Sequence, residues 1–146
     1  NLKNIRKVGK DGNHISFLLS NREYNIPVIG FGKISMLEKV LSIPSSYIVH
    51  LNENIYKGRR SIQLILYNVE DQDNFDYKID EEKMKVLKSL INKTKSKIIK
   101  TDIFLLVEKL NKLYNTKITA EEIVCMIKKA DNIQYAFKND ILYIKK

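Results

Sequence analysis

The sequence has very few of the residues from which many functional sites are built. Only one of its 146 residues is a cysteine, Cys125, and only two are histidines, His14 and His50. A single cysteine excludes a disulfide framework and a zinc cluster, and it favours a reducing compartment such as the cytoplasm. The histidines have no partner at ligand spacing, so we expect them to lie in strands rather than to bind a metal.

Long apolar runs and catalytic motifs are also missing. No run of 18 apolar residues occurs and the start lacks a signal-peptide pattern, so no membrane span is predicted. The chain contains no glycine-rich phosphate loop, no nucleophile elbow and no paired-carboxylate motif. We therefore expect no catalytic site and no cofactor in this chain. The first residue is Asn1 rather than Met, which predicts a processed product or a piece of a longer protein.

Positive charge is what the chain has in excess. It has 26 basic and 17 acidic residues, a net charge of +9, with a globular hydrophobic content of 44%. An excess of this size suits a polyanion or an acidic partner, although Lys-rich and Asn-rich usage can also follow from an AT-rich genome. The length fits one ordinary domain or two small ones.

Residues 1–70 show the alternation of a small β-sheet interrupted by one short helix. Asp11-Gly12 predicts the first turn, and Pro44 ends the helix. The order of three strands, a helix and two strands is that of an OB fold, a five-stranded barrel that binds single-stranded nucleic acid. The predicted strands are residues 2–8, 14–19, 24–31, 47–52 and 61–67, and the helix is residues 33–41.

The connection between the last two strands is the strongest candidate for a binding site. Residues 54–60 can turn at Gly58, and they bring one aromatic ring and three cations to the end of a hairpin. An aromatic ring can stack on any base, and the side chain of Lys or Arg can bind phosphate. The alternative is a hairpin tip that charge keeps soluble. The candidate contacts, with one from the loop after the first strand, are Tyr56, Lys57, Arg59, Arg60 and Lys10.

Two aromatic residues of the predicted sheet are further candidates for stacking on bases. These are Phe17 and Tyr24. The alternative for both is ordinary packing in the core, where phenylalanine is usually found.

Residues 71–79 change to an acidic, amide-rich composition that predicts a linker before a second domain. A capping box at Thr119 to Glu122 marks the start of the last helix of that domain. Helix, short strand, helix, helix, hairpin is the order of a winged helix. The predicted elements are a helix from Asp80 to about Asn92, a strand at Ile98-Ile99, helices over 102–113 and 120–130, and a hairpin over 133–144.

The third helix of this domain begins with acidic residues. Glu121 and Glu122 would repel phosphates where a DNA-reading helix enters the groove, whereas Lys128 and Lys129 lie at its far end. The helix either reads DNA or has a structural or protein-contacting role, with residues 120–130 as the candidate partner surface. The lysines of residues 93–100 either touch phosphate or form a solvated loop.

The hairpin resembles a segment of a known family. Its residues fit the pattern Leu-x-x-Asn-x-aromatic-x-Gly-x-x-x-x-Gln-Leu, found late in the OB domain of RecJ, the single-strand-specific DNA exonuclease. Ile29 to Gly32 resembles the Gly-Phe-Gly segment of that family, and Asn1-Leu2-Lys3 resembles the opening of its OB domain. Residues after about 70 resemble, more loosely, the extra C-terminal domain of some RecJ proteins of Gram-positive bacteria. The hairpin residues that carry the resemblance are Leu51, Asn54, Tyr56, Gly58, Arg59, Arg60, Gln63 and Leu64.

The resemblance implies the C-terminal part of a 5′–3′ single-stranded-DNA exonuclease. The catalytic DHH core of that family binds manganese or magnesium, and its motif does not occur in this chain. The implied task is to hold single-stranded DNA and feed it to catalytic domains of the same parent chain. The sequence departs from the family at Asn68, where an Asp is common, and at Glu70, where a basic residue is usual.

We therefore predict an α+β chain in which a five-stranded OB-fold β-barrel, residues 1–70, precedes a winged-helix-like domain, residues 80–146. The expected function is single-stranded DNA binding. The alternative is a protein-interaction module of a replication or repair assembly, because the middle subunit of replication protein A pairs the same two folds and uses the second for protein contacts. A complete small enzyme is the third possibility, and no motif supports it.

Overall fold

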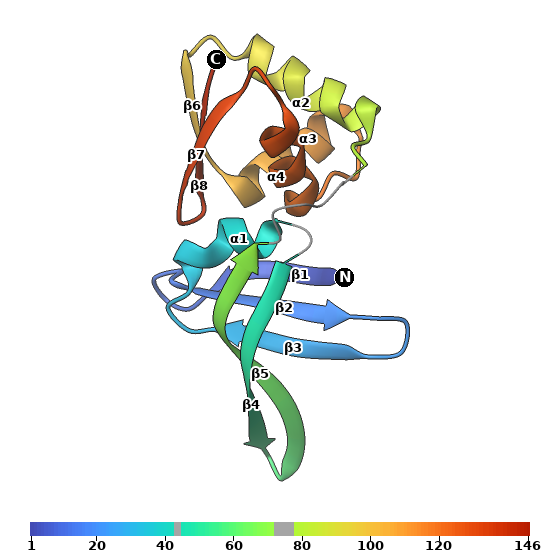
Figure 1. Cartoon of the computed structure of the whole chain (residues 1–146), viewed down its shortest axis with the longest axis vertical. Helices are drawn as coiled ribbons and strands as arrows, with labels where there is room; N and C mark the ends of the chain where they lie inside the picture. The colour runs from blue at the N-terminus through green and yellow to red at the C-terminus, as the bar shows by residue number, and fades with distance from the viewer. Residues whose placement is uncertain (43–44, 72–77) are drawn as a thin grey trace.

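A computed structural model describes residues 1–42, 45–71 and 78–146 of the chain. Residues 72–77 of the predicted linker, and Pro44, lie outside the described residues. The fold is mixed α+β, with a strand-rich N-terminal half and a largely helical C-terminal half that pack against each other (Figure 1).

The N-terminal half is a five-stranded sheet with the order β1-β2-β3-β5-β4. Neighbouring strands are antiparallel except β3 and β5, which run parallel at Val28–Leu64 and Ile29–Ile65. A short helix separates β3 from β4, as predicted, and this arrangement is consistent with an OB domain. The elements are β1 (Leu2–Val8), β2 (His14–Ser20), β3 (Asn25–Gly30), a 3-10 turn (Ile34–Met36), α1 (Leu37–Leu41), β4 (Ser45–Tyr56) and β5 (Arg59–Asp71).

The predicted closed barrel is wrong, because the sheet is open between its first and last strands. Among the described residues β4 pairs only with β5, and β1 pairs only with β2. The other side of β1 is turned toward the C-terminal half, since residues 2–5 line a shallow hollow together with Phe104, Val107 and residues 118–121. The second half of the chain thus lies where barrel closure would occur.

The β4–β5 hairpin is longer than the alternation of apolar residues predicted. Its register is unbroken from the pair Val49–Leu66 to the pair Tyr56–Arg59, so the turn consists of Lys57 and Gly58 alone. Both have positive φ, 48° and 74°, which is the conformation that a two-residue hairpin turn requires. Most residues near the end of the hairpin are polar, so they lack the alternation of apolar residues that predicts a strand. Backbone pairing nevertheless continues through them.

The C-terminal half has the predicted order of helix, strand, helix, helix and hairpin. Its strands form a second sheet with the order β6-β8-β7. Asp80 and Thr119 cap their helices, and Thr119 and Glu122 form the predicted capping box. Thr101, directly before the predicted helix 102–113, lies in a strand, and Asp102 caps the helix that follows. The elements are α2 (Glu81–Lys93), β6 (Ile98–Asp102), α3 (Ile103–Tyr114), α4 (Ala120–Lys129), β7 (Gln134–Lys138) and β8 (Ile141–Lys145).

Helix α4 lies in the core that the two halves share. Seven of its ten residues are buried, including Cys125 and the acidic residue Glu121, which is 8% exposed. Tyr47 of β4 is close enough to Glu121 that burial, with the charge of this carboxylate, raises the pKa of Tyr47 to about 12. At the far end of α4, Lys128 Nζ donates to Ser42 Oγ at 2.6 Å. One hydrophobic cluster therefore runs through both halves.

A lysine of β1 connects the two halves electrostatically. Lys7 Nζ lies 2.6 Å from a carboxylate oxygen of Asp102 and 2.5 Å from one of Asp140. Burial by itself raises the pKa of Asp102, but hydrogen bonds from Lys7 Nζ and from the backbone N–H of Phe104 and Leu105 lower it below its ordinary value overall. The ion pair therefore also orders the start of α3.

Gly30 occupies a position where no side chain fits. A Cβ there would lie 2.9 Å from both Ile15 Cγ1 and Lys33 Cβ, and 3.3 Å from Leu66 Cδ2. We expect Gly30→Ala to lower the free energy of unfolding by about 2 kcal/mol, because overpacking forces the core apart. Urea denaturation would measure this. Gly58→Ala, whose Cβ meets open space, should cost only the backbone strain of about 1 kcal/mol. Equal losses for the two variants would contradict the packing argument.

Replacing Lys7 should weaken the contact between the halves in a pH-dependent way. Lys7→Met keeps the apolar stem but removes the charge, and we expect the free energy of unfolding to fall by about 1.5 kcal/mol at pH 7. Because the pKa of Asp102 is lowered by folding, its stabilisation is present above the ordinary value of 3.8 and is lost as the pH falls through the folded value. Denaturation curves of wild type and variant should thus converge in acid. Lys109→Met, on the exposed side of α3, is the control that should show no such difference.

Candidate nucleic-acid interface

The outer part of the β4–β5 hairpin projects from the molecule as a two-stranded arm, seen at the bottom of Figure 1. We call residues 50–62 the arm; every one of them is exposed. β3 contacts β5 in register only at Leu64 and Ile65, so within the arm each strand has only the other as its strand partner. A ribbon of this kind presents its side chains to solvent on both faces.

The tip of the arm carries the predicted aromatic ring and cations. Tyr56 is 67% exposed, and Lys57 Nζ lies 5.4 Å from the centroid of its ring. Arg60 is also exposed, and one guanidinium nitrogen lies 3.6 Å from a carboxylate oxygen of Glu53. An exposed ion pair at this distance is weak, so the guanidinium remains available to a phosphate. The structure therefore brings together Tyr56, Lys57, Arg59 and Arg60.

The two faces of the arm differ in chemistry, because residues that lie directly opposite each other share a face. Tyr56 and Arg59 are opposite each other and share one face, which we call the outer face. The other face continues the core side of the sheet and carries Ile55 opposite Arg60. Further toward the base, the outer face holds Asn54, Ser61, Asn52, Gln63 and His50, whereas the core-side face holds Glu53, Ile62 and Leu51.

The remaining predicted contacts are not gathered at the tip. Lys10 lies in the turn before β2 and Tyr24 in the turn after it, so the length of this strand separates them. Tyr24 is exposed and lines a hollow with Ile26 and Ile62, on the core side of the hairpin. Phe17 is 1% exposed and packs on Tyr47, with ring centroids 5.6 Å apart. A ring buried in this way has no face free for a base, so Phe17 follows the core alternative.

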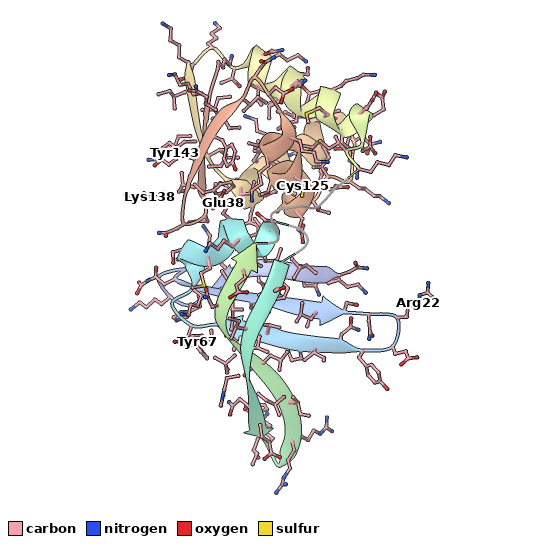
Figure 2. All side chains as sticks on the ribbon, viewed as in Figure 1. Arg22, Glu38, Tyr67, Cys125, Lys138 and Tyr143 are labelled. Atoms are coloured by element: carbon pink, nitrogen blue, oxygen red, sulfur yellow. The ribbon has the colours of Figure 1, made fainter. Side chains whose placement is uncertain are left out.

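Sequence reasoning missed a second group of exposed rings at the base of the hairpin. Tyr67 of β5 is 69% exposed and lies at the surface (Figure 2). Phe31, directly after β3, is 58% exposed. Lys33 Nζ lies 5.5 Å from the centroid of the Tyr67 ring. We call Phe31, Lys33 and Tyr67 the base cluster. Only Phe31 had a signal in the sequence, as part of Gly30-Phe31-Gly32.

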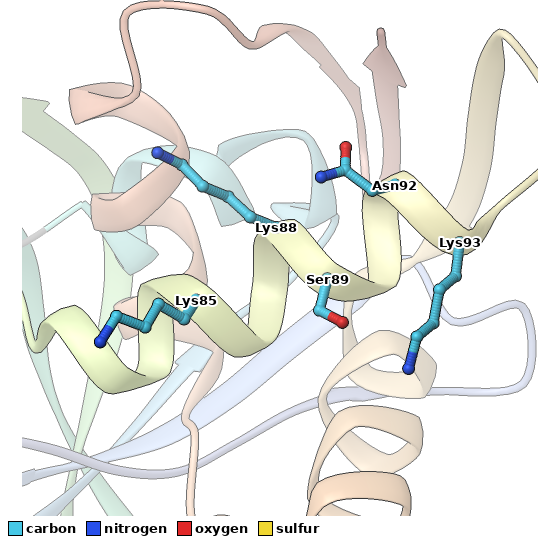
Figure 3. A pocket seen from close by; sticks show the side chains of 5 residues that line it. All are labelled: Lys85, Lys88, Ser89, Asn92 and Lys93. Atoms are coloured by element: carbon cyan, nitrogen blue, oxygen red, sulfur yellow. The ribbon is translucent and has the colours of Figure 1, made fainter.

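A second basic surface lies along α2. A shallow hollow there is lined by Lys85, Lys88 and Lys93 with Ser89 and Asn92, and Figure 3 shows these side chains extending from the same helix. Lys85 Nζ donates to Glu82 at 2.7 Å, and Lys93 Nζ lies 5.4 Å from the ring centroid of Tyr114. The first lysine of the predicted basic run, Lys93, therefore has an intramolecular partner.

The acidic start of α4 does not face an outside partner. Glu121 is buried, and Glu122 accepts from Lys83 Nζ at 2.6 Å and from the backbone N–H of Thr119 at 2.9 Å. Of the predicted partner surface, residues 120–130, the chain itself buries residues 120, 121 and 123–127, and it leaves Lys128 and Lys129 exposed. A helix buried to this extent has no face to place in a DNA groove, so the structural role is the one that the packing supports.

In the part of the chain that the structure describes, no group of three or more His, Cys, Asp or Glu side chains is placed to hold a metal ion. No helix among these residues is long and apolar enough to cross a membrane.

Comparison with known protein families gives a match over the N-terminal part of the chain. Residues 1–68 match the family model of the RecJ OB domain. This match supports a RecJ-type OB domain over these residues, and an OB domain of this type suggests binding of nucleic acid. Neither the curated proteins nor the solved structures contained a match to the chain.

Proposed function

We propose that this chain is the C-terminal part of a RecJ-like 5′–3′ single-stranded-DNA exonuclease, in which it holds the DNA strand for a catalytic DHH core that lies outside this chain. The Mn²⁺ or Mg²⁺ of such an enzyme would be held by that core. Such a protein would act in DNA repair or recombination, in the cytoplasm.

The observation that carries this proposal is the exposed, cationic and aromatic tip of the arm on a sheet with OB order. Tyr56 supplies a ring for stacking on a base, while Lys57, Arg59 and Arg60 supply donors for phosphate. Lys10 and Tyr24 lie in other turns of the sheet, where they would contact a longer piece of single-stranded DNA. The RecJ OB match over residues 1–68 points to the same ligand.

The C-terminal half acts in this proposal as a winged-helix-like support for the sheet. Its order of elements and its three-stranded sheet are those of a winged helix. Its third helix is buried against the first half, which leaves the arm as the surface for the ligand. In winged helices that read DNA, by contrast, the third helix itself enters the groove.

Loss of the two arginines at the tip should weaken DNA binding and reduce its salt dependence. For Arg59→Ala with Arg60→Ala we expect roughly tenfold lower affinity for a labelled single strand, measured by fluorescence anisotropy. The slope of log K against log salt concentration should fall by about 1.4, since each phosphate contact on a single strand contributes about 0.7.

The matched control removes two positive charges elsewhere. Lys109→Ala with Lys112→Ala changes exposed residues of α3 and lowers the net charge equally, so it tests whether only total charge matters. The proposal is contradicted if wild type shows no salt-sensitive binding, or if the two double variants have the same affinity for the labelled strand.

The core-side face of the arm supports a second function, protein contact. Ile55 and Ile62 are exposed there, on the continuation of the apolar face that is buried nearer the base. The proposed partner is the catalytic part of the same parent chain.

Polar replacement of this apolar face should separate the two functions. Ile55→Ser with Ile62→Ser should weaken binding of the arm to separately prepared catalytic domains, in a pull-down at high salt, because apolar contacts survive screening. Anisotropy with single-stranded DNA should change less than twofold, since these side chains lie opposite to the face of Tyr56. A large loss of DNA affinity would mean that the strand uses the core-side face.

A further inference from the structure

The outer face of the hairpin carries exposed rings at both of its ends. Tyr56 and Arg59 stand at the tip, and Tyr67 stands at the base. Tyr67 is the extra residue of a bulge: Ile48 is opposite Asn68 and Val49 is opposite Leu66, so Tyr67 has no directly opposite residue. The bulge thus turns a large side chain outward at the point where the strand enters the body of the sheet.

The turn after β3 joins Tyr67 at the base. Ile29 and Ile65 are in register in the parallel pair β3–β5, so the residues that follow them, Phe31 and Tyr67, come at the same end of the two strands. Lys33, two residues after Phe31, places its Nζ over the Tyr67 ring. His14 Nδ1 accepts from the Gly32 backbone N–H at 2.7 Å, and its ring meets that of Phe31 edge-on at 5.6 Å. The base cluster is therefore held in place by β2.

The side chains between the tip and the base cluster suit a nucleic-acid strand. They are mostly amides, a hydroxyl and an imidazole, which donate and accept hydrogen bonds. Glu53 is the one acidic residue among residues 50–67, and it lies on the core-side face. A phosphate chain on the outer face therefore meets no carboxylate between the rings. The polar residues on that face are Asn54, Ser61, Asn52, Gln63 and His50.

The distance between the two ring positions fits a short single strand. Arg59 and Tyr67 are eight steps apart along β5, or about 26 Å at the rise of an extended strand. Phosphates are about 3.4 Å apart along the axis in stacked DNA and farther apart when the strand is stretched, so roughly four to eight nucleotides cover this distance. That length lies within the usual site size for one OB fold.

Among the described residues, the middle of β2 and β3, which OB folds use most often, presents no aromatic side chain to solvent. The outward-facing residues in the middle of β2 and β3 include Ser16, Leu18, Pro27 and Ile29, whereas Phe17 points into the core. Bases therefore find no stacking partner in the middle of these two strands, whereas Tyr56 and Tyr67 are exposed along the hairpin.

We infer that single-stranded DNA lies lengthwise on the outer face of the β4–β5 hairpin, with one base stacked at Tyr56 beside Arg59 and another at the base cluster of Tyr67, Phe31 and Lys33. This inference rests on the proposed function, since it gives the path of the strand whose binding is proposed there. The tip and the base cluster form the two ends of one continuous site.

The test uses the absence of tryptophan from this chain, which makes an introduced indole the only one. In Tyr67→Trp, titration with an oligothymidylate of 12 nucleotides should quench the indole fluorescence as a base stacks on it. Leu113→Trp, at an exposed position of α3, is the matched control and should not be quenched. In anisotropy, Tyr67→Ala should lower the affinity for the same strand roughly fivefold or more, while Tyr67→Phe keeps it.

The possible failures point to different errors. If wild type binds the strand and the double arginine variant weakens it, but Tyr67→Ala binds like wild type and Tyr67→Trp is not quenched, the path is wrong and the proposed function stands. If wild type shows no salt-sensitive binding, both are wrong. Unfolding midpoints of the Tyr67 variants equal to wild type would show that any loss of binding does not come from misfolding.

Discussion

The burial of α4 between the two halves is the constraint on which the rest of the structure depends. This helix buries seven of its ten residues in the core shared with α1 and α3, and groups at both of its ends bond within the chain. The halves therefore pack as one unit, with Lys7 joining β1 to Asp102 and Asp140 at the edge of the contact. A helix engaged in this way supports the sheet and leaves ligand binding to other surfaces.

The arm gains its binding chemistry from the alternation of side chains along a ribbon. Pairing in register from Val49–Leu66 to Tyr56–Arg59 assigns each residue to one of two faces. Apolar residues and the single acid fall on the core-side face, while rings, amides and Arg59 fall on the outer face. One hairpin thus offers a surface suited to nucleic acid and, on its other side, a surface suited to protein. The bulge at Tyr67 extends the outer face into the body of the sheet.

Much of the fold was predictable because local signals and tertiary structure agree. Asp11-Gly12, the Thr119–Glu122 capping box and the period of two in residues 47–52 and 61–67 each have a local physical cause, and each lies in or beside the element it predicts. Of the candidate site, the tip residues are exposed as expected. Phe17, in contrast, is buried in the core. The exposure of Tyr67 could not be predicted, because nothing local distinguishes an exposed tyrosine from a buried one in an apolar strand.

By itself the sequence determined the order of the elements, the capped helix ends, and the concentration of positive charge and one aromatic ring around Gly58, since turns, caps and periodicity act over a few residues. Only the tertiary structure decided that the sheet stays open, that α4 is buried rather than presented to DNA, and that Phe31, Lys33 and Tyr67 meet at the base of the hairpin. These outcomes depend on contacts between residues far apart in the chain, and no local pattern encodes which distant surface a given face will cover.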